Sequence, residues 1–416
     1  MTNLNKEQQV AHDTIIDCVA NDEVGLITLD STAGTGKSYT LIQTIKTLIF
    51  NQYLLPSEII IGLANHKQRC LWEKLLRESG IPSDVECFTT HKLLKFFPAT
   101  DDYGVQHLIG ANLDVEALPF RVVILDEAYS LPQVLIEAIY SNGHLLGVLA
   151  GDSEQLPPVK ERESSIGSTV QDILYELKLT QNMRQKDPEL KAIVDTIKIQ
   201  QGRYKPNFTT KSNFLTDLVE DVDENWEETC FISYYNETVN FVSDFIRQQL
   251  FDTKGTRLLP GEYLRVSGIR DGKKVIVPTA EIVQVVSQSK DMSTVIVLFD
   301  GCEYVAKIDI KDESPKMLVH AIEKNDKKYW AMYYDKLNSF TTFRHPSVQT
   351  CHGVQGSTYE NVYLDWKSFT SARNFDRGFW VAASRSSKYL SFCNEYIAPW
   401  KKRNNASNKI IDRHRK

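Results

Sequence analysis

The sequence predicts an α/β protein with two parallel-sheet blocks and an inserted β domain. A glycine-rich loop at residues 30–38 lies between an apolar strand and a helix, and a second apolar strand ends in two adjacent carboxylates. Short β-rich runs begin at residue 260, and the α/β alternation resumes near residue 348. A chain of 416 residues is too long for one hydrophobic core, so several domains are expected.

The composition excludes several classes of protein. A chain that is 42% hydrophobic and 25% charged is typical of folded globular proteins. The net charge of -6 means that a nucleic-acid partner would have to be held in a local channel. The seven cysteines include no C-x-x-C pair, which favours neither a zinc site nor a disulfide framework. No apolar run reaches membrane-spanning length, so we expect a cytoplasmic protein.

The glycine loop predicts a phosphate-binding site. The apolar run at residues 26–29 predicts a buried strand, and residues 39–50 carry apolar side chains at helical spacing. Backbone N–H groups of such a loop converge on a phosphate, Lys37 reaches the β and γ phosphates, and Ser38 can ligate Mg²⁺. Ser31 stands where the usual pattern has its first glycine. An ordinary glycine turn is the alternative.

A helix over residues 5–20 precedes this loop. The amide of Gln8 or Gln9 can both donate and accept, so either residue is placed to reach an adenine edge. Asn5 and Gln8 also satisfy a capping-box pattern, which needs no ligand. Both interpretations stay open.

Two further strands end in polar side chains. Residues 58–64 lead to His66, and residues 85–88 lead to Thr90 and His91. Side chains just past the carboxyl ends of parallel strands point into the crevice where open α/β sheets bind ligands. A single histidine there is more often an ordinary surface or core residue, but two at equivalent strand ends favour a ligand contact.

The strand at residues 122–125 delivers the strongest catalytic candidates. Asp126 is placed to hold the hydration shell of Mg²⁺, and Glu127 to orient and deprotonate an attacking water. Packing alone would leave these two like charges without a partner. The next apolar run, residues 144–150, leads to Gln155, which is placed to sense a γ-phosphate.

The ordered motifs resemble motifs I to VI of superfamily 1 helicases. The matching stretches are STAGTGKS, LDEAY, GDSEQLPPV, LTQNMR, TCHGVQGST and WVAASRS. QLPPV, HGVQG and the inserted β domain are most similar to the RecD/Dda branch, superfamily 1B, and the length is similar to that of the phage Dda helicase. The departures are Ser31, Trp380, Ser384 and Ser386.

The resemblance implies a motor with two RecA-like domains and ATP in the cleft between them. Its expected parts are a first domain at 1–185 with a strand-separating pin at about 96–119, a second domain at 186–258 and 340–400, an SH3-like β-barrel at 259–339, and a basic tail at 401–416. The implied activity is translocation from 5′ to 3′ along single-stranded DNA, with unwinding of duplex DNA.

The resemblance also assigns roles to residues. The catalytic set is Lys37, Asp126, Glu127, Gln155, Arg184 and Arg385, with Mg²⁺ held by Ser38 and Asp126 and with Arg385 supplied by the second domain. The ATP contacts are Gln8, Ala33, Gly34, Thr35, Gly36, Lys37, Ser38 and Gly356. The single-strand track is lined by His66, Thr90, His91, Thr350 and His352.

The pin segment is otherwise a turn-rich excursion, for which a plain loop is the alternative. We expect Phe96 and Phe97 to be core residues, and Tyr103 and His107, which lie among Asp, Gly and Gln, to form the tip. The expected partners are single-stranded and forked DNA, with replication or recombination proteins also possible, and the chain is expected to act as a monomer.

Other functions fit parts of the pattern. A phosphate loop with an acid pair alone also suits a kinase or a simple ATPase. An ATP-gated clamp that remodels nucleic acid without unwinding it, and an RNA helicase of the same superfamily, are the two alternative functions.

Overall fold

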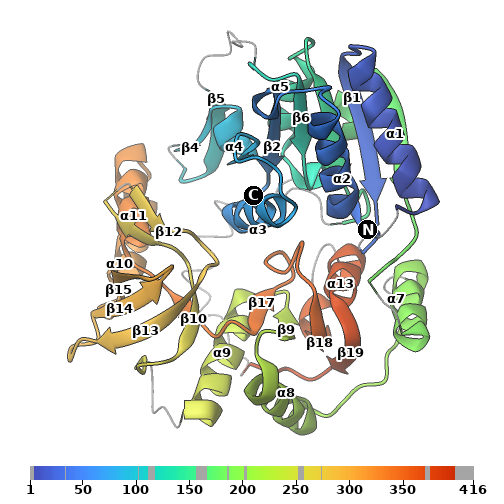
Figure 1. The fold of residues 1–416 in the computed structure, drawn as a ribbon. Helices are drawn as coiled ribbons and strands as arrows, with labels where there is room; N and C mark the ends of the chain where they lie inside the picture. The colour runs from blue at the N-terminus through green and yellow to red at the C-terminus, as the bar shows by residue number, and fades with distance from the viewer. Residues whose placement is uncertain are drawn as a thin grey trace. The chain divides into compact units, whose positions relative to one another are not determined.

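The computed structural model describes residues 4–32, 34–101, 103–110, 118–155, 166–184, 187–200, 204–251, 257–272, 274–370 and 375–398. The chain divides into two compact units. Unit 1 comprises Met1–Phe97, Leu108–Gln201 and Asp376–Ser387, and unit 2 comprises Pro98–His107, Gly202–Phe375 and Lys388–Lys416. Figure 1 labels their helices and strands.

Unit 1 is built on a six-stranded sheet in the order β3-β2-β6-β7-β1-β8, with parallel pairing along it. Its strands are β1 (Gly25–Ser31), β2 (Ile59–Leu63), β3 (Glu86–Thr89), β6 (Val122–Leu125), β7 (Leu146–Gly151) and β8 (Ile173–Leu179). Every residue of β2, β6 and β7 is buried. Strands covered on both faces read as continuous apolar runs, which is why the sequence revealed them.

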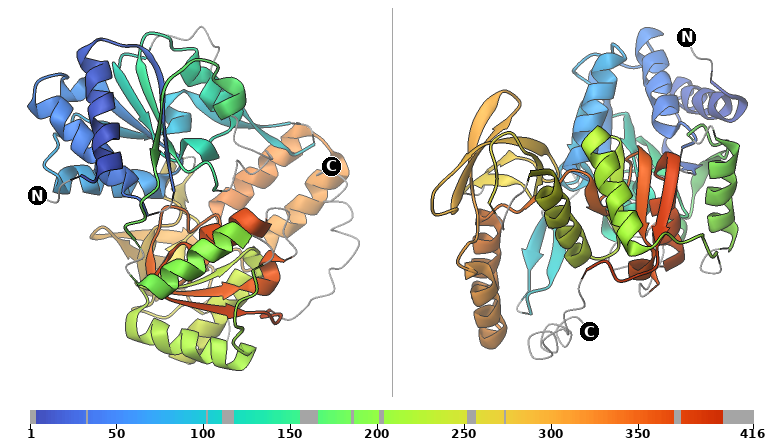
Figure 2. Two further views of the ribbon diagram at one scale, coloured as in Figure 1. Left: turned by 90° about the vertical axis from the view of Figure 1, so that its right-hand side faces the viewer. Right: turned by 90° about the horizontal axis from the view of Figure 1, so that it is seen from below.

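Helices cover both faces of this sheet. The helical elements of unit 1 are α1 (Lys6–Ala20), α2 (Lys37–Phe50), η1 (Pro56–Glu58), α3 (His66–Glu78), α4 (Thr90–Leu93), η2 (Ala128–Ser130), α5 (Gln133–Tyr140), α6 (Ile166–Thr169), α7 (Pro188–Gln200) and most of α13 (Phe375–Ala383). One core cluster joins α1, α2 and α3 to Ile59 and Ile61 of β2, and another joins α4 and α5 to Ile60 (Figure 2). Alternate residues of the strand therefore face opposite cores.

Unit 2 contains a second α/β layer. Its four-stranded sheet has the order β17-β9-β18-β19, and β9 pairs in parallel with both neighbours. The elements are α8 (Lys211–Asn225), β9 (Thr229–Ser233), α9 (Asn236–Phe251), β17 (Val348–Thr350), β18 (Tyr359–Asp365), α12 (Trp366–Phe369) and β19 (Ser386–Cys393). Phe214 of α8 packs edge-on against Phe231 and Tyr363 of the sheet. The prediction of two α/β blocks is confirmed.

The insertion between β9 and β17 begins as the expected β structure. A five-stranded antiparallel sheet in the order β15-β14-β13-β10-β16 stands beside the hairpin β11–β12. The strands are β10 (Tyr263–Val266), β11 (Ile269–Asp271), β12 (Lys274–Val277), β13 (Ile282–Gln288), β14 (Thr294–Phe299), β15 (Cys302–Lys307) and β16 (Phe343–Arg344). The SH3-like barrel stays a prediction for this sheet.

The expectation of an all-β insertion was wrong for its last part. Two helices, α10 (Glu313–Lys324) and α11 (Lys327–Ser339), lie between β15 and β16. The Asp309 carboxylate accepts hydrogen bonds from two backbone N–H groups at the start of α10, and Asp326 caps α11 through the N–H of Lys328. These caps, followed by aromatic residues at helical spacing in α11, were the sequence signal that was missed.

The excursion at 96–119 forms a β-hairpin. Its strands are β4 (Phe96–Thr100) and β5 (Gln106–Gly110), and residues 111–117 lie outside the described part. Phe96 is buried as expected, but Phe97 is 58% exposed, so its assignment to the core was wrong. Tyr103 is 59% exposed, in agreement with its placement at the tip.

The tip of this hairpin packs on α11 within unit 2. The Tyr334 hydroxyl donates to the Gly104 carbonyl over 2.9 Å, and a Cβ added to Gly104 would lie 2.5 Å from the Trp330 ring. The Asp101 carboxylate accepts hydrogen bonds from the N–H groups of Tyr103 and Val105, which closes the turn.

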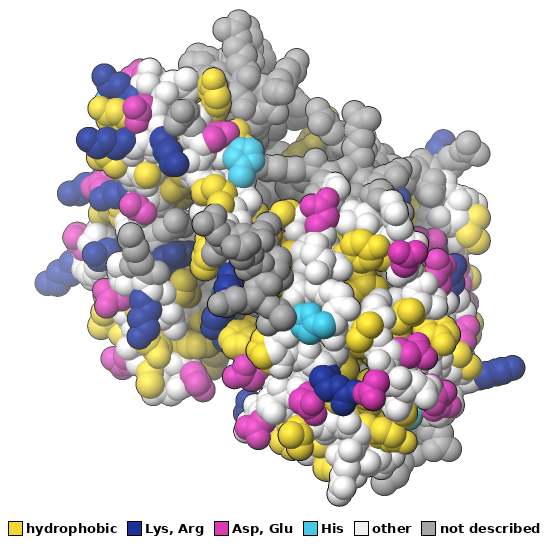
Figure 3. Space-filling model, turned by 90° about the horizontal axis from the view of Figure 1, so that it is seen from above, with side chains coloured by type: hydrophobic (Ala, Val, Ile, Leu, Met, Phe, Trp, Pro, Cys, Tyr) yellow, Lys and Arg dark blue, Asp and Glu magenta, His cyan; other side chains and the backbone are white. Residues whose placement is uncertain are grey.

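The surface carries charges of both signs. On the face drawn in Figure 3, Lys and Arg side chains are interspersed with Asp and Glu. Among the described residues, no helix is both long and apolar enough to cross a bilayer.

Candidate nucleotide site

The glycine loop joins β1 to α2 at the carboxyl edge of the unit 1 sheet. Ser31 is the last residue of β1, and its buried hydroxyl donates to the Gly151 carbonyl of β7 over 3.0 Å. A strand residue in this position needs no glycine, which accounts for the departure from the usual pattern. Gly34 and Gly36 have φ values of 83° and 82°, which favour glycine. Ala33 lies outside the described residues.

Gln8 forms the predicted capping box and also contacts the glycine loop. Its Oε1 accepts from the Asn5 N–H over 3.0 Å, while Asn5 Oδ1 accepts from the Gln8 N–H over 2.9 Å, forming a capping box. Its Nε2 donates to the Thr35 carbonyl over 2.9 Å and so contacts the glycine loop. Gln9 instead bonds Asp13 on the exposed face of the same helix. An adenine contact by Gln8 stays a prediction.

The segment that carries Arg184 packs against the same loop. The Met183 N–H donates to the Gly34 carbonyl over 2.7 Å, and the Thr32 N–H donates to the Leu179 carbonyl over 3.2 Å. Glu7 of α1 accepts from both the N–H and the hydroxyl of Thr180 over 2.6 Å. The segment that leads to Arg184 is thus held by the glycine loop and by α1.

Lys37 and the two strand-end carboxylates form the centre of the site. Lys37 Nζ lies 2.7 Å from Asp126 Oδ1 and 3.1 Å from Glu127 Oε1. Burial lowers the pKa of Lys37, but the charges of Asp126 and Glu127 outweigh it and leave that pKa raised. Glu127 has φ 56°, and its N–H donates to Asp126 Oδ1 over 2.9 Å. The other oxygen, Oδ2, accepts from the indole N–H of Trp72 over 2.8 Å.

Gln155 contacts a carboxylate that the sequence analysis missed. Its Nε2 donates to Asp152 Oδ2 over 3.3 Å, just past the end of β7. Burial, with a further contribution from the Glu127 charge, raises the pKa of Asp152 to about 6. The position of Asp152 directly after a buried strand was the available signal, because Asp126 follows β6 in the same way.

Both predicted arginines lie in unit 1. Arg385 is 1% exposed, and its guanidinium donates to the Val381 carbonyl over 2.9 Å and to Ser384 Oγ over 3.2 Å. Arg184 Nη1 donates to the Ser384 carbonyl over 2.9 Å. Burial and the Arg385 charge lower the pKa of Arg184 to about 9, against the influence of Glu127 and Asp152. The resemblance implied that Arg385 comes from the second domain, whereas Asp376–Ser387 groups with unit 1.

The Asp126 carboxylate and the Ser38 hydroxyl are oxygen ligands of the kind that suits Mg²⁺ bound together with a nucleotide. Among the described residues, no cluster of three or more His, Cys, Asp or Glu is arranged to hold a metal. Mg²⁺ commonly takes one or two carboxylates and completes its shell with phosphate oxygens and water. Asp126 already holds a cationic group, the Lys37 ammonium, and Ser38 supplies a hydroxyl in the first turn of α2.

The single-strand candidates fall into two groups. In unit 1, His66 opens α3 after β2, and Thr90 and His91 open α4 after β3, which pairs with β2. His66 is exposed and His91 half-buried, but Thr90 is fully buried and its hydroxyl donates to the Leu63 carbonyl over 3.2 Å. Thr90 therefore supports the fold of this edge.

The second group lies in unit 2, in the turn after β17. The Thr350 hydroxyl accepts from the Gly353 N–H over 3.2 Å, and Gly356 has φ 79°. His352 is exposed, with its ring edge-on to Tyr234 at 5.9 Å. The roles proposed for these residues stay predictions.

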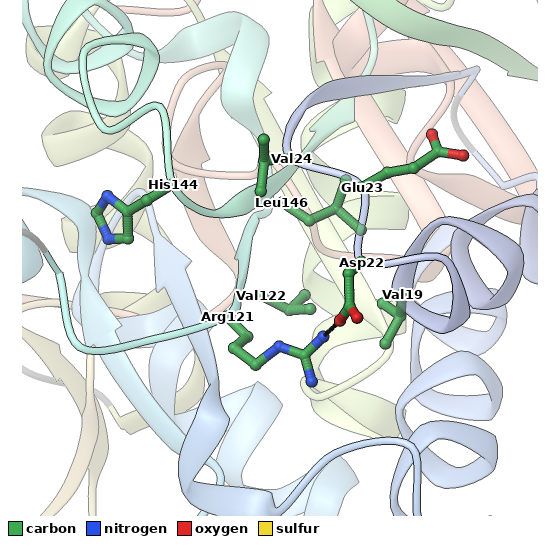
Figure 4. A pocket seen from close by; sticks show the side chains of 8 residues that line it. All are labelled: Val19, Asp22, Glu23, Val24, Arg121, Val122, His144 and Leu146. Carbon is green, nitrogen blue, oxygen red and sulfur yellow. Dashed lines mark hydrogen bonds and ion pairs between the residues drawn. The ribbon is translucent and has the colours of Figure 1, made fainter.

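A separate pocket opens at the opposite edge of the unit 1 sheet. It has a volume of about 160 Å³ and is lined by Val19, Asp22, Glu23, Val24, Arg121, Val122, His144 and Leu146 (Figure 4). Arg121 and Asp22 form an ion pair within it. The pocket lies beside the first residues of β6 and β7, away from the carboxyl edge where open parallel sheets bind ligands.

Comparison with known proteins places the chain in a family. A family model described as AAA domain matches residues 3–216. An uncharacterized protein of Acanthamoeba polyphaga mimivirus is 21% identical over 495 residues, covering 94% of this chain and 100% of that protein.

Solved structures of Pif1 helicases share the fold along the chain. The Candida albicans Pif1 helicase is 16% identical, with a TM-score of 0.54 and coverage of 100% of both chains. The Bacteroides Pif1 helicase, in complex with ADP-AlF3 and single-stranded DNA, is 16% identical, with a TM-score of 0.53 and coverage of 100% of this chain and 98% of that one. The chain belongs to the AAA domain family, and its fold is similar to that of the Pif1 helicases.

Proposed function

We propose that this protein is an ATP-dependent DNA helicase that moves from 5′ to 3′ along single-stranded DNA and unwinds duplex DNA. The observation that carries the proposal is the pairing of Lys37 Nζ with Asp126 and Glu127 at the end of a parallel sheet, beside a glycine loop. Such a cluster joins a phosphate-binding cation to an acid pair suited to hydrolysis. Single-stranded DNA in the similar Bacteroides structure supports the choice of polymer.

Hydrolysis follows from the roles of these residues. The loop N–H groups and Lys37 hold the β and γ phosphates of ATP. Asp126 and Ser38 would hold Mg²⁺, which neutralises charge on the phosphates. Glu127 accepts a proton from the attacking water while the new oxygen–phosphorus bond forms and the bond to ADP breaks. Gln155, Arg184 and Arg385 stabilise the charge that develops on the γ-phosphoryl group.

Movement requires a second domain that responds to ATP. In our proposal the domains divide as the sequence predicted, at 1–185 and at 186–258 with 340–400, and ATP lies between them. Closure on ATP and reopening after hydrolysis then shift the DNA track, formed by His66, His91, Thr350 and His352, along one strand. The polarity rests on the resemblance to superfamily 1B.

The decisive experiment measures ATPase rate with no nucleic acid, with single-stranded DNA and with RNA. We expect stimulation by DNA, and a stronger response to RNA would favour an RNA helicase. Strand separation is then measured on duplexes with a 5′ or a 3′ tail. Opening of the 3′-tailed duplex alone would contradict the polarity, and DNA-stimulated ATPase without any opening would favour a clamp.

A further inference from the structure

We propose that Trp72 is a positioning residue for the Mg²⁺-binding carboxylate, holding Asp126 so that its other oxygen faces the bound cation. This inference rests on the proposed function of the nucleotide site. The geometry behind it is the hydrogen bond from the Trp72 indole N–H to Asp126 Oδ2, which measures 2.8 Å and joins residues 54 positions apart.

Trp72 is built into the core and does not reach the site from the surface. It lies in α3, is 1% exposed and belongs to the same hydrophobic cluster as Leu76 and the apolar residues of α1 and α2. An indole N–H can only donate, and a buried donor without a partner is costly. Packing therefore fixes the ring, and the N–H in turn fixes the carboxylate.

The two oxygens of Asp126 have different partners. Oδ1 receives the Lys37 ammonium at 2.7 Å and the Glu127 N–H at 2.9 Å, whereas Oδ2 receives Trp72. With Oδ2 held by the indole N–H, the carboxylate presents Oδ1 to the cation. Removing a hydrogen bond to a carboxylate that binds a metal typically lowers the metal affinity about 10–100-fold.

The test compares two substitutions in α3. Trp72→Phe removes the N–H and keeps an aromatic ring, and Leu76→Ala disturbs the same core without touching Asp126. For each variant, the affinity for ADP is measured by equilibrium binding in EDTA and over a series of Mg²⁺ concentrations. The Mg²⁺ concentration for half-maximal ATPase rate and the melting temperature complete the set.

We expect Trp72→Phe to raise the required Mg²⁺ concentration about 10-fold and to reduce the gain in ADP affinity that Mg²⁺ provides. ADP affinity in EDTA should not change. Leu76→Ala should lower the melting temperature and leave the Mg²⁺ response unchanged. An unchanged Mg²⁺ response in Trp72→Phe, or an equal shift in both variants, would overturn the proposal.

Two further measurements keep the result interpretable. If Trp72→Phe does not fold, benzothienylalanine at position 72 removes the N–H and preserves the shape of the ring, with the same expected shift. In an Asp126→Asn background, replacing Trp72 should cause no further change in Mg²⁺ response, because the carboxylate is gone. Failure of wild-type protein to hydrolyse ATP would reject the proposed function, whereas Mg²⁺-dependent ADP binding would still test Trp72.

Discussion

At the scale of single residues, the site depends on charges that are buried but paired. Lys37 faces both Asp126 and Glu127, and Asp126 has donors on each of its oxygens. Asp152 is the exception, because its nearby partners are amide groups and its burial raises its pKa to about 6. Glu127, Asp152 and the buried Arg385 each yield a prediction.

Glu127→Gln should bind ATP but hydrolyse it at least about a hundredfold more slowly. The amide preserves the size of the side chain and cannot accept the proton of the attacking water. Single-turnover hydrolysis and equilibrium ATP binding, measured on one preparation, separate the two steps. Turnover at the wild-type rate would show that Glu127 is not the base.

Arg385→Ala should reduce turnover by about a thousandfold if Arg385 stabilises the transition state. ATP binding should change less, because this contact strengthens as charge develops. Arg385 also donates to the Val381 carbonyl, so the melting temperature should fall as well. Arg385→Lys, which retains the charge without the fork of donors, is the matched control. A loss of stability with unchanged turnover of the folded protein would make Arg385 purely structural.

Asp152→Asn should stabilise the protein at neutral pH by on the order of 2 kcal/mol. Because the pKa of Asp152 in the folded protein, about 6, lies above the ordinary value of 3.8, folded protein binds more protons between these values and wild-type stability falls as pH rises through this window. The amide has no such dependence. Urea unfolding at pH 4 and pH 8 should show the gain at pH 8 and little difference at pH 4. Equal effects at both pH values would contradict the shift.

At the scale of elements, the β4–β5 hairpin and α11 form the least expected pairing. Sequence reasoning treated the hairpin as a pin on the first domain and gave α11 no helical structure. In the structure, residues Pro98–His107 belong to unit 2, where Gly104 lies against Trp330 and Tyr334. The hairpin tip is therefore supported by α11, a helix that the sequence analysis did not predict.

Gly104→Ala should slow duplex unwinding more than DNA-stimulated ATP hydrolysis. The added Cβ would meet the Trp330 ring at 2.5 Å, so the tip must move away from α11. Gly301→Ala is a matched control, because Gly301 also has a positive φ, 75°, but nothing lies within 4 Å of its Cβ. The comparison measures base pairs opened per ATP for both variants. If both lose the same fraction of coupling, the hairpin contact is not involved.

At the scale of the whole molecule, the charge balance constrains DNA binding. The net charge is -6, and the face in Figure 3 mixes both signs. Binding of single-stranded DNA must then rely on local contacts with phosphates. Such contacts release counterions, so affinity should fall steeply with salt.

We expect the logarithm of the DNA association constant to fall linearly with the logarithm of salt concentration, with a slope of about -0.7 per phosphate contacted. Fluorescence anisotropy of a labelled oligonucleotide from 50 to 300 mM salt measures the slope, at roughly physiological pH. Nucleotide binding without DNA, measured over the same salt range, serves as the control. A slope near zero would mean that stacking, not phosphate contact, dominates the track.

The sequence by itself determined the α/β class, the strands near residues 26–29, 58–64, 85–88, 122–125 and 144–150, the glycine loop and the acid pair. Each of these is a contiguous stretch whose own periodicity or turn chemistry requires the structure that forms. The motifs also led to the expectation of a helicase-like fold, and the chain shares its fold with the Pif1 helicases.

Only the tertiary structure decided the contacts between distant stretches. Trp72 reads as an ordinary apolar position of a helix, and its bond to Asp126 depends on how α3 packs beside β6. In the sequence, Ser31 is only a departure from the glycine-loop pattern. In the structure, its hydroxyl donates to the Gly151 carbonyl of β7. The grouping of Arg385 with Arg184 across 200 residues likewise has no local signal. Periodicity fixes which face of an element is buried, whereas the partner met on that face depends on the register and packing of the whole sheet.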